Sequence, residues 1–367
     1  MSVNRFSQDA AQVALEKFKS GQINRRSFMT ALAGLGLAAT FKPGAASAEV
    51  SEIVICNWGG AALEAFEKAY GAPFTDATGI EVVVDGAGPS TGAVRAMVES
   101  KNVIWDATDG GMVDATTLGA GGYIEPIDYS IVDKSLVGEG LAAEYGICNY
   151  TFSNVLAYDA TKTGETAPTS WADFFDLEKY PGKRTMCKWI QGQLESVLLA
   201  DGVKPEDMYP LDVDRAFAKL EPLLPEIIFW EGGAQSQQLF RDGEVVMGNI
   251  WHTRANLLRK ENPDFTWTWN QNLLFASAWS VPKGNPAGKK VFDFINSSLQ
   301  PEGQVELLRL MGNGPSNPKA LELMTEEDKA VYALAPENAK NNLPVSAAYY
   351  AENEAELQNR FLDFISR

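Results

Sequence analysis

The stretch SEIVICNWGG, residues 51–60, is a β-rich run that ends at two glycines. This pattern predicts a strand that breaks into a glycine loop. Residues 61–74 follow with Leu63, Phe66 and Tyr70 at helical spacing, and the β-branched run at 80–85 predicts a second strand. A β-loop-α-β unit is typical of parallel sheets with right-handed crossovers. The predicted fold class is therefore α/β.

The same order of elements recurs directly downstream. Residues 93–100 have a helical pattern, residues 103–108 form a buried apolar run, and DGGM at 109–112 supplies a second glycine-containing turn. Ligands of open α/β sheets lie outside the carboxyl ends of the strands, where both glycine turns are expected. Each glycine pair taken alone is equally consistent with a simple tight turn.

The length of the chain indicates two lobes. At 367 residues the chain exceeds what one hydrophobic core usually serves. The β-branched and aromatic segment at 147–158 predicts a crossover into a second lobe, and residues 273–282 predict the return. Two crossing strands would form a hinge that closes around a ligand. The predicted divisions are residues 49–155 with 272–320 for lobe 1, 156–271 for lobe 2, and 321–367 for C-terminal helices packed on the lobes.

The first 48 residues have the pattern of an export signal. NRRSFM at 24–29 is followed by an uncharged run at 30–41 and by small residues that end at Ala48. This order is typical of a twin-arginine signal cleaved after Ala48, and the apolar run is too short for a membrane anchor. We expect export to the periplasm. The alternative is an amphipathic N-terminal helix of a cytoplasmic protein.

Charge and composition exclude several classes of partner. The chain has a net charge of −17, with 45% hydrophobic and 22% charged residues. An acidic surface repels phosphate backbones and anionic lipids, so we expect no nucleic-acid partner and no binding to membrane surfaces. The sequence after the signal holds no apolar run of spanning length, so direct membrane insertion is not expected.

The cysteine and histidine inventory argues against a cofactor. Cys56, Cys148 and Cys187 form no CxxC pair, and His252 is the single histidine. Zinc, haem and iron–sulfur sites need more ligands than this. The cysteines are either one disulfide with one thiol or three buried small hydrophobes. One histidine and no phosphate-binding GxxxxGKS leave no constellation for catalysis, so we predict no enzyme and no cofactor.

Five blocks of sequence, taken in order, resemble the periplasmic spermidine/putrescine-binding proteins of ABC importers. The blocks are NWGG at 57–60, PTSWADFFD at 168–176, FWEGGAQSQQLFRDGEVVMGNIW at 229–251, SVPKG at 280–284 and GNGPSNPKA at 312–320. That family has the type 2 periplasmic binding fold, two α/β lobes with mixed, mostly parallel sheets joined by a two-stranded hinge. The resemblance implies a monomeric solute-binding protein that delivers a small ligand to a membrane permease.

The resemblance also implies an aromatic clamp. Carried over residue by residue, the clamp maps onto Trp58, Trp230 and Trp251. An aromatic face can stack against an extended apolar ligand or attract a cation. A core side chain is the alternative reading for each tryptophan.

The chain departs from the family where polyamine binders hold ammonium groups. Those proteins use carboxylates, because a buried cation needs a paired charge. Arg254 stands at one such position, Ser277 at another, and the segment with Lys188 and Trp189 holds no acid. We therefore predict an anionic ligand with a carboxylate, which the planar guanidinium of Arg254 can bind with two hydrogen bonds. A structural salt bridge is the alternative for Arg254.

Groups at the ends of strands would complete the site. Backbone N–H groups of the two glycine pairs and nearby hydroxyls can surround an anion. The predicted ligand-binding residues are Trp58, Gly59, Gly60, Ser90, Thr91, Thr108, Asp109, Lys188, Trp189, Trp230, Trp251, Arg254 and Ser277.

Two other ligands remain open. A polyamine would require Asp106, Asp109 or Glu231 to replace the missing acids. Ferric ion is the second, because related binding proteins ligate iron through adjacent tyrosines and Tyr349-Tyr350 is such a pair. Packing on a helix face is the competing role for these tyrosines. The sequence identifies neither the anion nor the permease.

Overall fold

The structure is a computed structural model that describes residues 50–367. The predicted export signal therefore lies outside the described residues. Within residues 50–367, no helix is both long and apolar enough to cross a membrane. Cys56, Cys148 and Cys187 are buried free thiols, which is the second of the two arrangements left open by the sequence.

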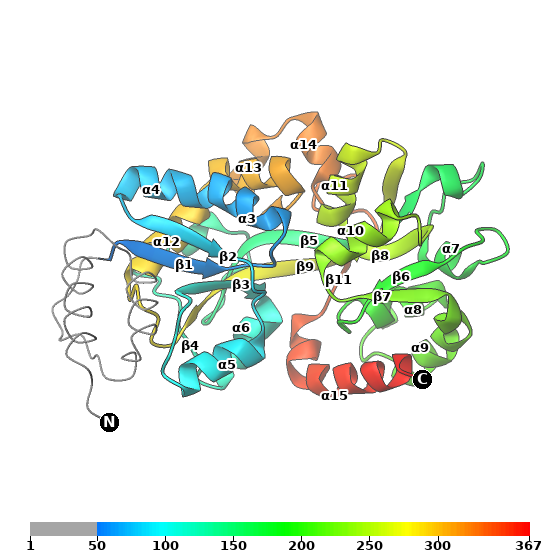
Figure 1. The fold of residues 1–367 in the computed structure, drawn as a ribbon, viewed down its shortest axis with the longest axis horizontal. Helices are drawn as coiled ribbons and strands as arrows, with labels where there is room; N and C mark the ends of the chain where they lie inside the picture. Colours follow the sequence, from blue (N-terminus) through cyan, green and yellow to red (C-terminus); the bar gives the residue numbers. More distant parts are fainter. Residues whose placement is uncertain (1–49) are drawn as a thin grey trace, which may run out of the picture.

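One mixed sheet of eleven strands runs through this part of the chain, with helices on both faces (Figure 1). Its main path is β2-β1-β3-β9-β5-β8-β6-β7, while β10 pairs with β5 and both β4 and β11 pair with β9. The α/β class is confirmed. The strands are β1 Glu52–Cys56, β2 Glu81–Asp85, β3 Ala107–Gly111, β4 Ile124–Glu125, β5 Ile147–Asp159, β6 Arg184–Cys187, β7 Ile227–Trp230, β8 Met247–Trp251, β9 Phe265–Pro282, β10 Gly314–Pro315 and β11 Leu343–Pro344.

The helices form a layer on each side of the sheet. In Figure 1, α3, α4, α12 and α13 lie above one end of the sheet and α5 and α6 below it, whereas α10 and α11 lie above the other end and α8, α9 and α15 below it. The α-helices are α3 Ala61–Phe66, α4 Ala72–Thr78, α5 Thr91–Glu99, α6 Met112–Ala120, α7 Trp171–Phe175, α8 Gln193–Ala200, α9 Val213–Leu220, α10 Gly233–Arg241, α11 His252–Glu261, α12 Lys290–Ser298, α13 Pro301–Met311, α14 Glu326–Val331 and α15 Ala347–Ile365. The short helices are η1 Glu67–Gly71, η2 Lys134–Leu136, η3 Ala160–Lys162, η4 Pro205–Asp207, η5 Glu221–Glu226 and η6 Pro318–Leu323.

Two long antiparallel strands join the two ends of the sheet. β5 and β9 pair from Ile147 opposite Trp279 to Asp159 opposite Phe265. On one side of them lie the parallel strands β1, β2 and β3, which we call with their helices the β1 half; on the other lie β6, β7 and β8, the β6 half. The register of β5 shifts between Asn154 and Leu156, and Gln271 in β9 has a φ of 59°. The predicted lobe boundaries at 155/156 and 271/272 fall at these irregularities, and the division itself stays a prediction.

Each half of the sheet has a hydrophobic core of its own. In the β1 half, Ile53, Phe66 and Phe294 belong to one cluster of buried side chains. In the β6 half, Trp171 of α7 and Phe361 of α15 belong to another. Burial of each large side chain contributes roughly 1.5–3 kcal/mol. The two halves share β5 and β9, and α6 of the β1 half also contacts α15, with Val113 of α6 belonging to the second cluster.

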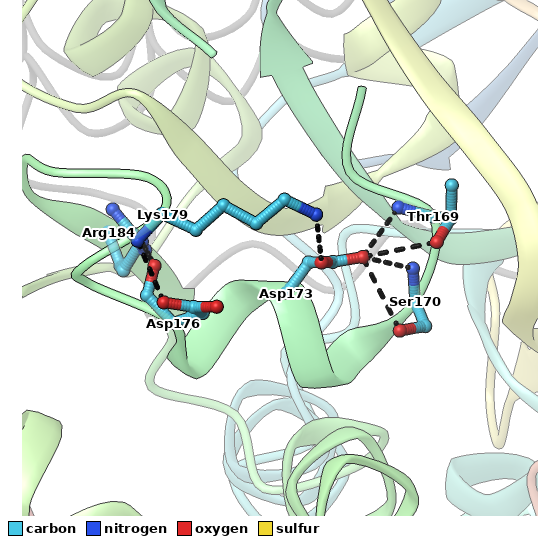
Figure 2. A network of polar contacts seen from close by, with 6 residues as sticks. All are labelled: Thr169, Ser170, Asp173, Asp176, Lys179 and Arg184. Atoms are coloured by element: carbon cyan, nitrogen blue, oxygen red, sulfur yellow. Dashed lines mark hydrogen bonds and ion pairs between the residues drawn. The ribbon is translucent and has the colours of Figure 1, made fainter. Parts of the chain in front are cut away.

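The start of α7 is capped by side chains, and its end is tied to the sheet by an arginine. Figure 2 shows the Asp173 carboxylate accepting hydrogen bonds from the N–H groups of Thr169 and Ser170 at 2.8 and 3.2 Å. Ser170 is the N-cap. Arg184 of β6 is fully buried and donates to the backbone carbonyls of Phe174, Asp176, Tyr180 and Gly182. Arg184 therefore fastens the end of α7 and the loop that follows it to β6.

Two local expectations are wrong. Asp109, Gly110 and Gly111 are not a turn but the end of β3, because they pair with β9 as far as Gly111 opposite Ser277. Tertiary pairing here overrides the low strand propensity of Asp and Gly. The first helical region runs on to Thr78 through η1 and α4, and Leu63 is 37% exposed rather than on its core face.

Candidate ligand-binding site

A cavity of about 830 Å³ lies between the two halves. Its wall combines the ends of β3, β6 and β8, the starts of α5, α6 and α11, the hinge strands β5 and β9, and one face of α15. Ligands of α/β sheets bind at the carboxyl ends of strands. The carboxyl ends of β3, β6 and β8 form part of this cavity wall. Its position between bodies joined by two strands is suited to closure around a small molecule.

Tryptophan rings from both halves meet at the cavity. Trp58, which follows β1, contacts Trp251 and Trp189 of the β6 half edge-on, with centroid distances of 5.9 and 6.4 Å. Trp251 rests on Trp230, whose centroid is 5.0 Å away. Trp58, Trp189 and Trp251 line the cavity, whereas Trp230 is fully buried behind Trp251. Trp189, rather than Trp230, thus lies with Trp58 and Trp251 at the cavity wall, and Trp230 is a core side chain.

Arg254 is a buried cation with no ion-pair partner among residues 50–367. It lies in the first turn of α11, lines the cavity and is 3% exposed. Its Nε and Nη1 atoms make no hydrogen bond, and no carboxylate within residues 50–367 forms an ion pair with it. The alternative of a structural salt bridge is thus wrong for the described chain. Burial lowers the pKa of Arg254, but a guanidinium remains charged at neutral pH.

The backbone around Arg254 adds to the positive potential. A Cβ on Gly233 would lie 2.4 Å from the Nε atom of Arg254, so a side chain at the first residue of α10 would displace the guanidinium from this position. The starts of α10 and α11 therefore lie together at this point. Helix N-termini carry free N–H groups and partial positive charge, which favour an anion and disfavour an isolated cation. An anion bound here would offset the unpaired charge.

Ser90 and Thr91 line the cavity at the start of α5. The Ser90 hydroxyl accepts a hydrogen bond from the N–H of Ala93 at 3.1 Å, so its own proton is available to a ligand. GPSTG at 88–92 matches the GxSxG pattern of serine hydrolases, but Ser90 is a helix cap here.

His252 is buried and neutral, because its Nδ1 accepts from Ser153 and its Nε2 lies 2.7 Å from the Gly312 carbonyl. Burial lowers its pKa to about 4.

Asp109 and Ser277 belong to one network across the hinge strands. Asp109 Oδ1 accepts from Asn149 Nδ2 at 2.9 Å and from the Ser277 hydroxyl at 2.8 Å, and Oδ2 accepts from the Tyr150 hydroxyl at 3.1 Å. Both residues line the cavity and are almost fully buried. Burial raises the pKa of Asp109 to about 6, and the three hydrogen bonds oppose this rise. Asp109 therefore joins β3, β5 and β9 at the cavity wall.

Five predicted residues do not line the cavity: Gly59, Gly60, Thr108, Lys188 and Trp230. The Thr108 hydroxyl lies 2.8 Å from that of Ser280, inside the sheet. Lys188 makes an exposed ion pair with Glu231. The role predicted for these two side chains conflicts with their placement, because each is already engaged elsewhere.

The first glycine loop is also engaged in the fold. The Gly59 N–H donates to Asn57 Oδ1 at 2.9 Å, so it is not available to an anion. Gly60 has a φ of 62° and forms the N-cap of α3, where a Cβ would lie 3.9 Å from Nη1 of Arg254. This loop therefore adjoins Arg254 without forming part of the wall.

Sequence reasoning missed the contribution of α15 and of α6. Glu354 and Gln358 of α15 and Asp114 of α6 line the cavity from opposite halves. Burial raises the pKa of Asp114 to about 6 and also raises that of Glu354. The C-terminal helices were expected only to pack on the lobes, and no motif in residues 347–365 marks a binding role.

The tyrosine pair considered for iron has other contacts. The Tyr350 hydroxyl donates to Glu195 Oε2 at 3.0 Å, and the Tyr349 ring packs against Tyr209 at 5.1 Å. Within residues 50–367, no group of three or more His, Cys, Asp or Glu side chains is arranged to hold a metal. These tyrosines therefore give the ferric alternative no support.

The chain is similar to a family of bacterial binding proteins and to several of its members. Residues 69–339 match the family model described as bacterial extracellular solute-binding protein. A gamma-aminobutyric acid-binding protein of Pseudomonas aeruginosa is 34% identical over 345 residues, 92% of this chain and 96% of that protein. The structure of a GABA receptor is 33% identical with a TM-score of 0.78, over 86% of this chain and 97% of that chain. A binding protein of A. tumefaciens R10 in complex with agropinic acid is 31% identical with a TM-score of 0.81, over 86% and 99%.

The resemblance to polyamine binders holds at a coarser level than expected. A spermidine/putrescine-binding protein of Streptococcus pneumoniae is 19% identical with a TM-score of 0.69, over 86% of this chain and 99% of that chain. This likeness shows the fold alone. The type 2 periplasmic binding fold is confirmed, and the relatives above 30% identity include proteins named for acids rather than for polyamines.

Proposed function

We propose a ligand class for this chain on one premise: the chain belongs to the bacterial extracellular solute-binding protein family, whose members bind a small solute and work with the permease of an ABC transporter. Proteins of this family are binding proteins rather than enzymes. The proposed solute is a small molecule with a carboxylate group, held by Arg254 between the β1 half and the β6 half.

This proposal is carried by the guanidinium of Arg254, which has no ion-pair partner in the described part of the chain. A buried charge without a partner costs several kcal/mol. A carboxylate offsets that cost, because its two oxygens match two N–H groups of the guanidinium. The starts of α10 and α11 and the Ser90 hydroxyl favour the same negative group.

The relatives support a more specific candidate, an ω-amino acid such as γ-aminobutyrate. The Pseudomonas aeruginosa relative is named for this compound. Such a ligand carries an ammonium group as well as a carboxylate, and the cavity wall holds the carboxyl groups of Asp109, Asp114 and Glu354. Carboxylates stabilise a buried ammonium group. Of these three acids, only Asp109 was named from the sequence as a possible partner of an ammonium group.

A true polyamine is a less favourable ligand. Two of the acids that would be needed are used elsewhere: Asp106 accepts from the backbone N–H groups of Val54 and Ala287, and Glu231 pairs with Lys188. A second cation beside the unpaired Arg254 would add to the unfavourable charge.

A thermal-shift screen tests the ligand class. A ligand that binds only the folded state at one hundred times its Kd stabilises that state by about 2.7 kcal/mol. We expect γ-aminobutyrate or another small carboxylate to raise the Tm, and putrescine and spermidine to leave it unchanged. A rise in Tm with polyamines and with no carboxylate would contradict the proposal.

We also propose that the protein reaches the periplasm by the twin-arginine route and acts there as a monomer. The motif at residues 24–29 supports the route. Replacing both Arg25 and Arg26 by lysine should leave the protein in the cytoplasm, as cell fractionation would show. Unchanged export of this variant would contradict the route, and a dimer mass in light scattering would contradict the monomer.

A further inference from the structure

One side chain of the C-terminal helix holds the loop that carries Trp189. Gln358 of α15 accepts a hydrogen bond from the N–H of Ile190 at 2.8 Å and donates one to the carbonyl of Lys188, also at 2.8 Å. These two backbone groups stand on either side of Trp189. A single amide thus uses its acceptor and its donor to fix the backbone at one aromatic residue of the cavity.

Trp189 has three further contacts, of which one is the hydrogen bond from its backbone N–H to Cys187 Sγ at 3.4 Å. The residue is 46% exposed and lines the cavity. Its indole N–H donates to the Glu231 carbonyl at 3.2 Å, and its ring touches Trp58 across the cavity. A loose exposed side chain would lose conformational entropy on meeting a ligand. Fixing the loop in advance reduces that cost.

The helix that supplies Gln358 is itself anchored in the β6 half. The buried Glu195 of α8 accepts from the hydroxyls of Tyr350 and Tyr209 at 3.0 and 2.8 Å. Phe364 of α15 stacks on Phe217 of α9 with a centroid distance of 4.3 Å. α15 is therefore a fixed support for the loop. It begins after residue 339, where the match to the family model ends.

We propose that Gln358 is a positioning residue that sets Trp189 for ligand binding, so that α15 helps to decide which solute the cavity accepts. This inference rests on the proposed function only for the identity of the ligand. The position of the loop is argued from the two hydrogen bonds of Gln358. Gln358 acts through the backbone at Lys188 and Ile190, and the ligand meets Trp189.

Gln358→Met tests the inference, because it keeps the length of the side chain and removes both hydrogen bonds. Hydrogen exchange of the unliganded protein should become faster at residues 188–192. The affinity for γ-aminobutyrate should fall roughly three- to tenfold, as expected for two lost hydrogen bonds. Glu356→Gln is the matched control, since Glu356 is exposed on the same helix and does not line the cavity. The control should change neither quantity.

A second variant keeps the test decisive if Gln358→Met does not fold. Gln358→Glu keeps the acceptor for Ile190 and loses the donor to Lys188, so it should raise exchange at 188–192 by a smaller amount. Unchanged exchange in these variants would overturn the inference. So would faster exchange with unchanged affinity, because Gln358 would then only stabilise the fold. A wild-type protein that binds no carboxylate would overturn the proposed function, while the exchange measurement would still decide whether Gln358 positions the loop.

Discussion

Two buried arginines of the β6 half stand in opposite environments. Arg184 in β6 has no exposed surface, and its guanidinium donates to four backbone carbonyls at 2.6–3.3 Å. Arg254 in α11 is equally well buried, and two of its nitrogens donate to nothing within residues 50–367. The same residue type at the same depth can thus belong to the fold or to a site. Unused hydrogen-bonding capacity distinguishes the two.

The charges around the two arginines differ as well. Burial lowers the pKa of Arg184 to about 10, and the carboxylates of Asp176 and Glu226 oppose this fall. For Arg254 the group that opposes the effect of burial is the Tyr150 hydroxyl. The positive charge of Arg184 is therefore compensated inside the chain. That of Arg254 has no carboxylate partner within residues 50–367.

Replacing Arg184 should have the largest effect on stability. Arg184→Met leaves four carbonyls of the α7 region without their donor, so we expect a loss of about 3–5 kcal/mol in the free energy of unfolding. Urea denaturation monitored by circular dichroism measures it. The matched control is Arg254→Met, which removes no hydrogen bond. Equal free energies of unfolding for Arg184→Met and wild type would contradict the stabilising role of Arg184.

A buried acid extends the comparison to pH. Burial raises the pKa of Glu195 to about 7, so in the folded state this carboxyl binds a proton that the unfolded chain has already lost. Its contribution to stability is complete below pH 4.5, the unfolded value, and is lost as the pH rises through about 7. In Glu195→Gln, the fall in the free energy of unfolding as the pH rises through about 7 should be smaller by up to about 3 kcal/mol.

The check is urea denaturation of wild type and Glu195→Gln at several values between pH 4.5 and 8. Leu→Ala variants would not serve as controls, because they leave cavities. Glu356→Gln is suitable, since it removes an exposed acid of α15. Parallel pH curves for wild type and Glu195→Gln would show that Glu195 is not the titrating group.

The acids of the cavity should instead act on ligand affinity. The pKa of Asp114 is raised to about 6, and the protonated carboxyl cannot pair with an ammonium group. The affinity for γ-aminobutyrate should therefore rise roughly fivefold from pH 5 to 7.5 as Asp114 ionises. Calorimetric titration at each pH measures this. Asp114→Asn should flatten the curve, and an undiminished rise in that variant would exclude Asp114 as the cause.

Much of the frame follows from local sequence. The β-branched runs predict β1, β2 and β5. These features depend on residues within a few positions of each other. Arg254 and Trp251 were found because a resemblance supplied the positions and the departure from it supplied the charge. The structure was needed to show that Arg254 has no ion-pair partner within residues 50–367.

The features that were missed depend on distant contacts. Gln358 bonds to Ile190, 168 positions earlier in the chain, and no local pattern on α15 indicates this pairing. Asp109 and Gly110 were expected in a turn, but pairing with β9 holds them in β3. Lys188 was expected to meet an anion, and its nearest carboxylate is Glu231. Side-chain contacts of this kind follow from the tertiary fold rather than from periodicity.

The most direct test of the central claim is a calorimetric titration of Arg254→Met with the carboxylate that wild type binds. Removing the guanidinium should weaken binding by about 2–5 kcal/mol, a factor of roughly thirty or more. The unliganded variant should unfold at the same urea concentration as wild type or a higher one, because a buried unpaired charge has been replaced by an apolar side chain. Wild-type affinity in Arg254→Met would contradict the account, since the ligand would then be held elsewhere.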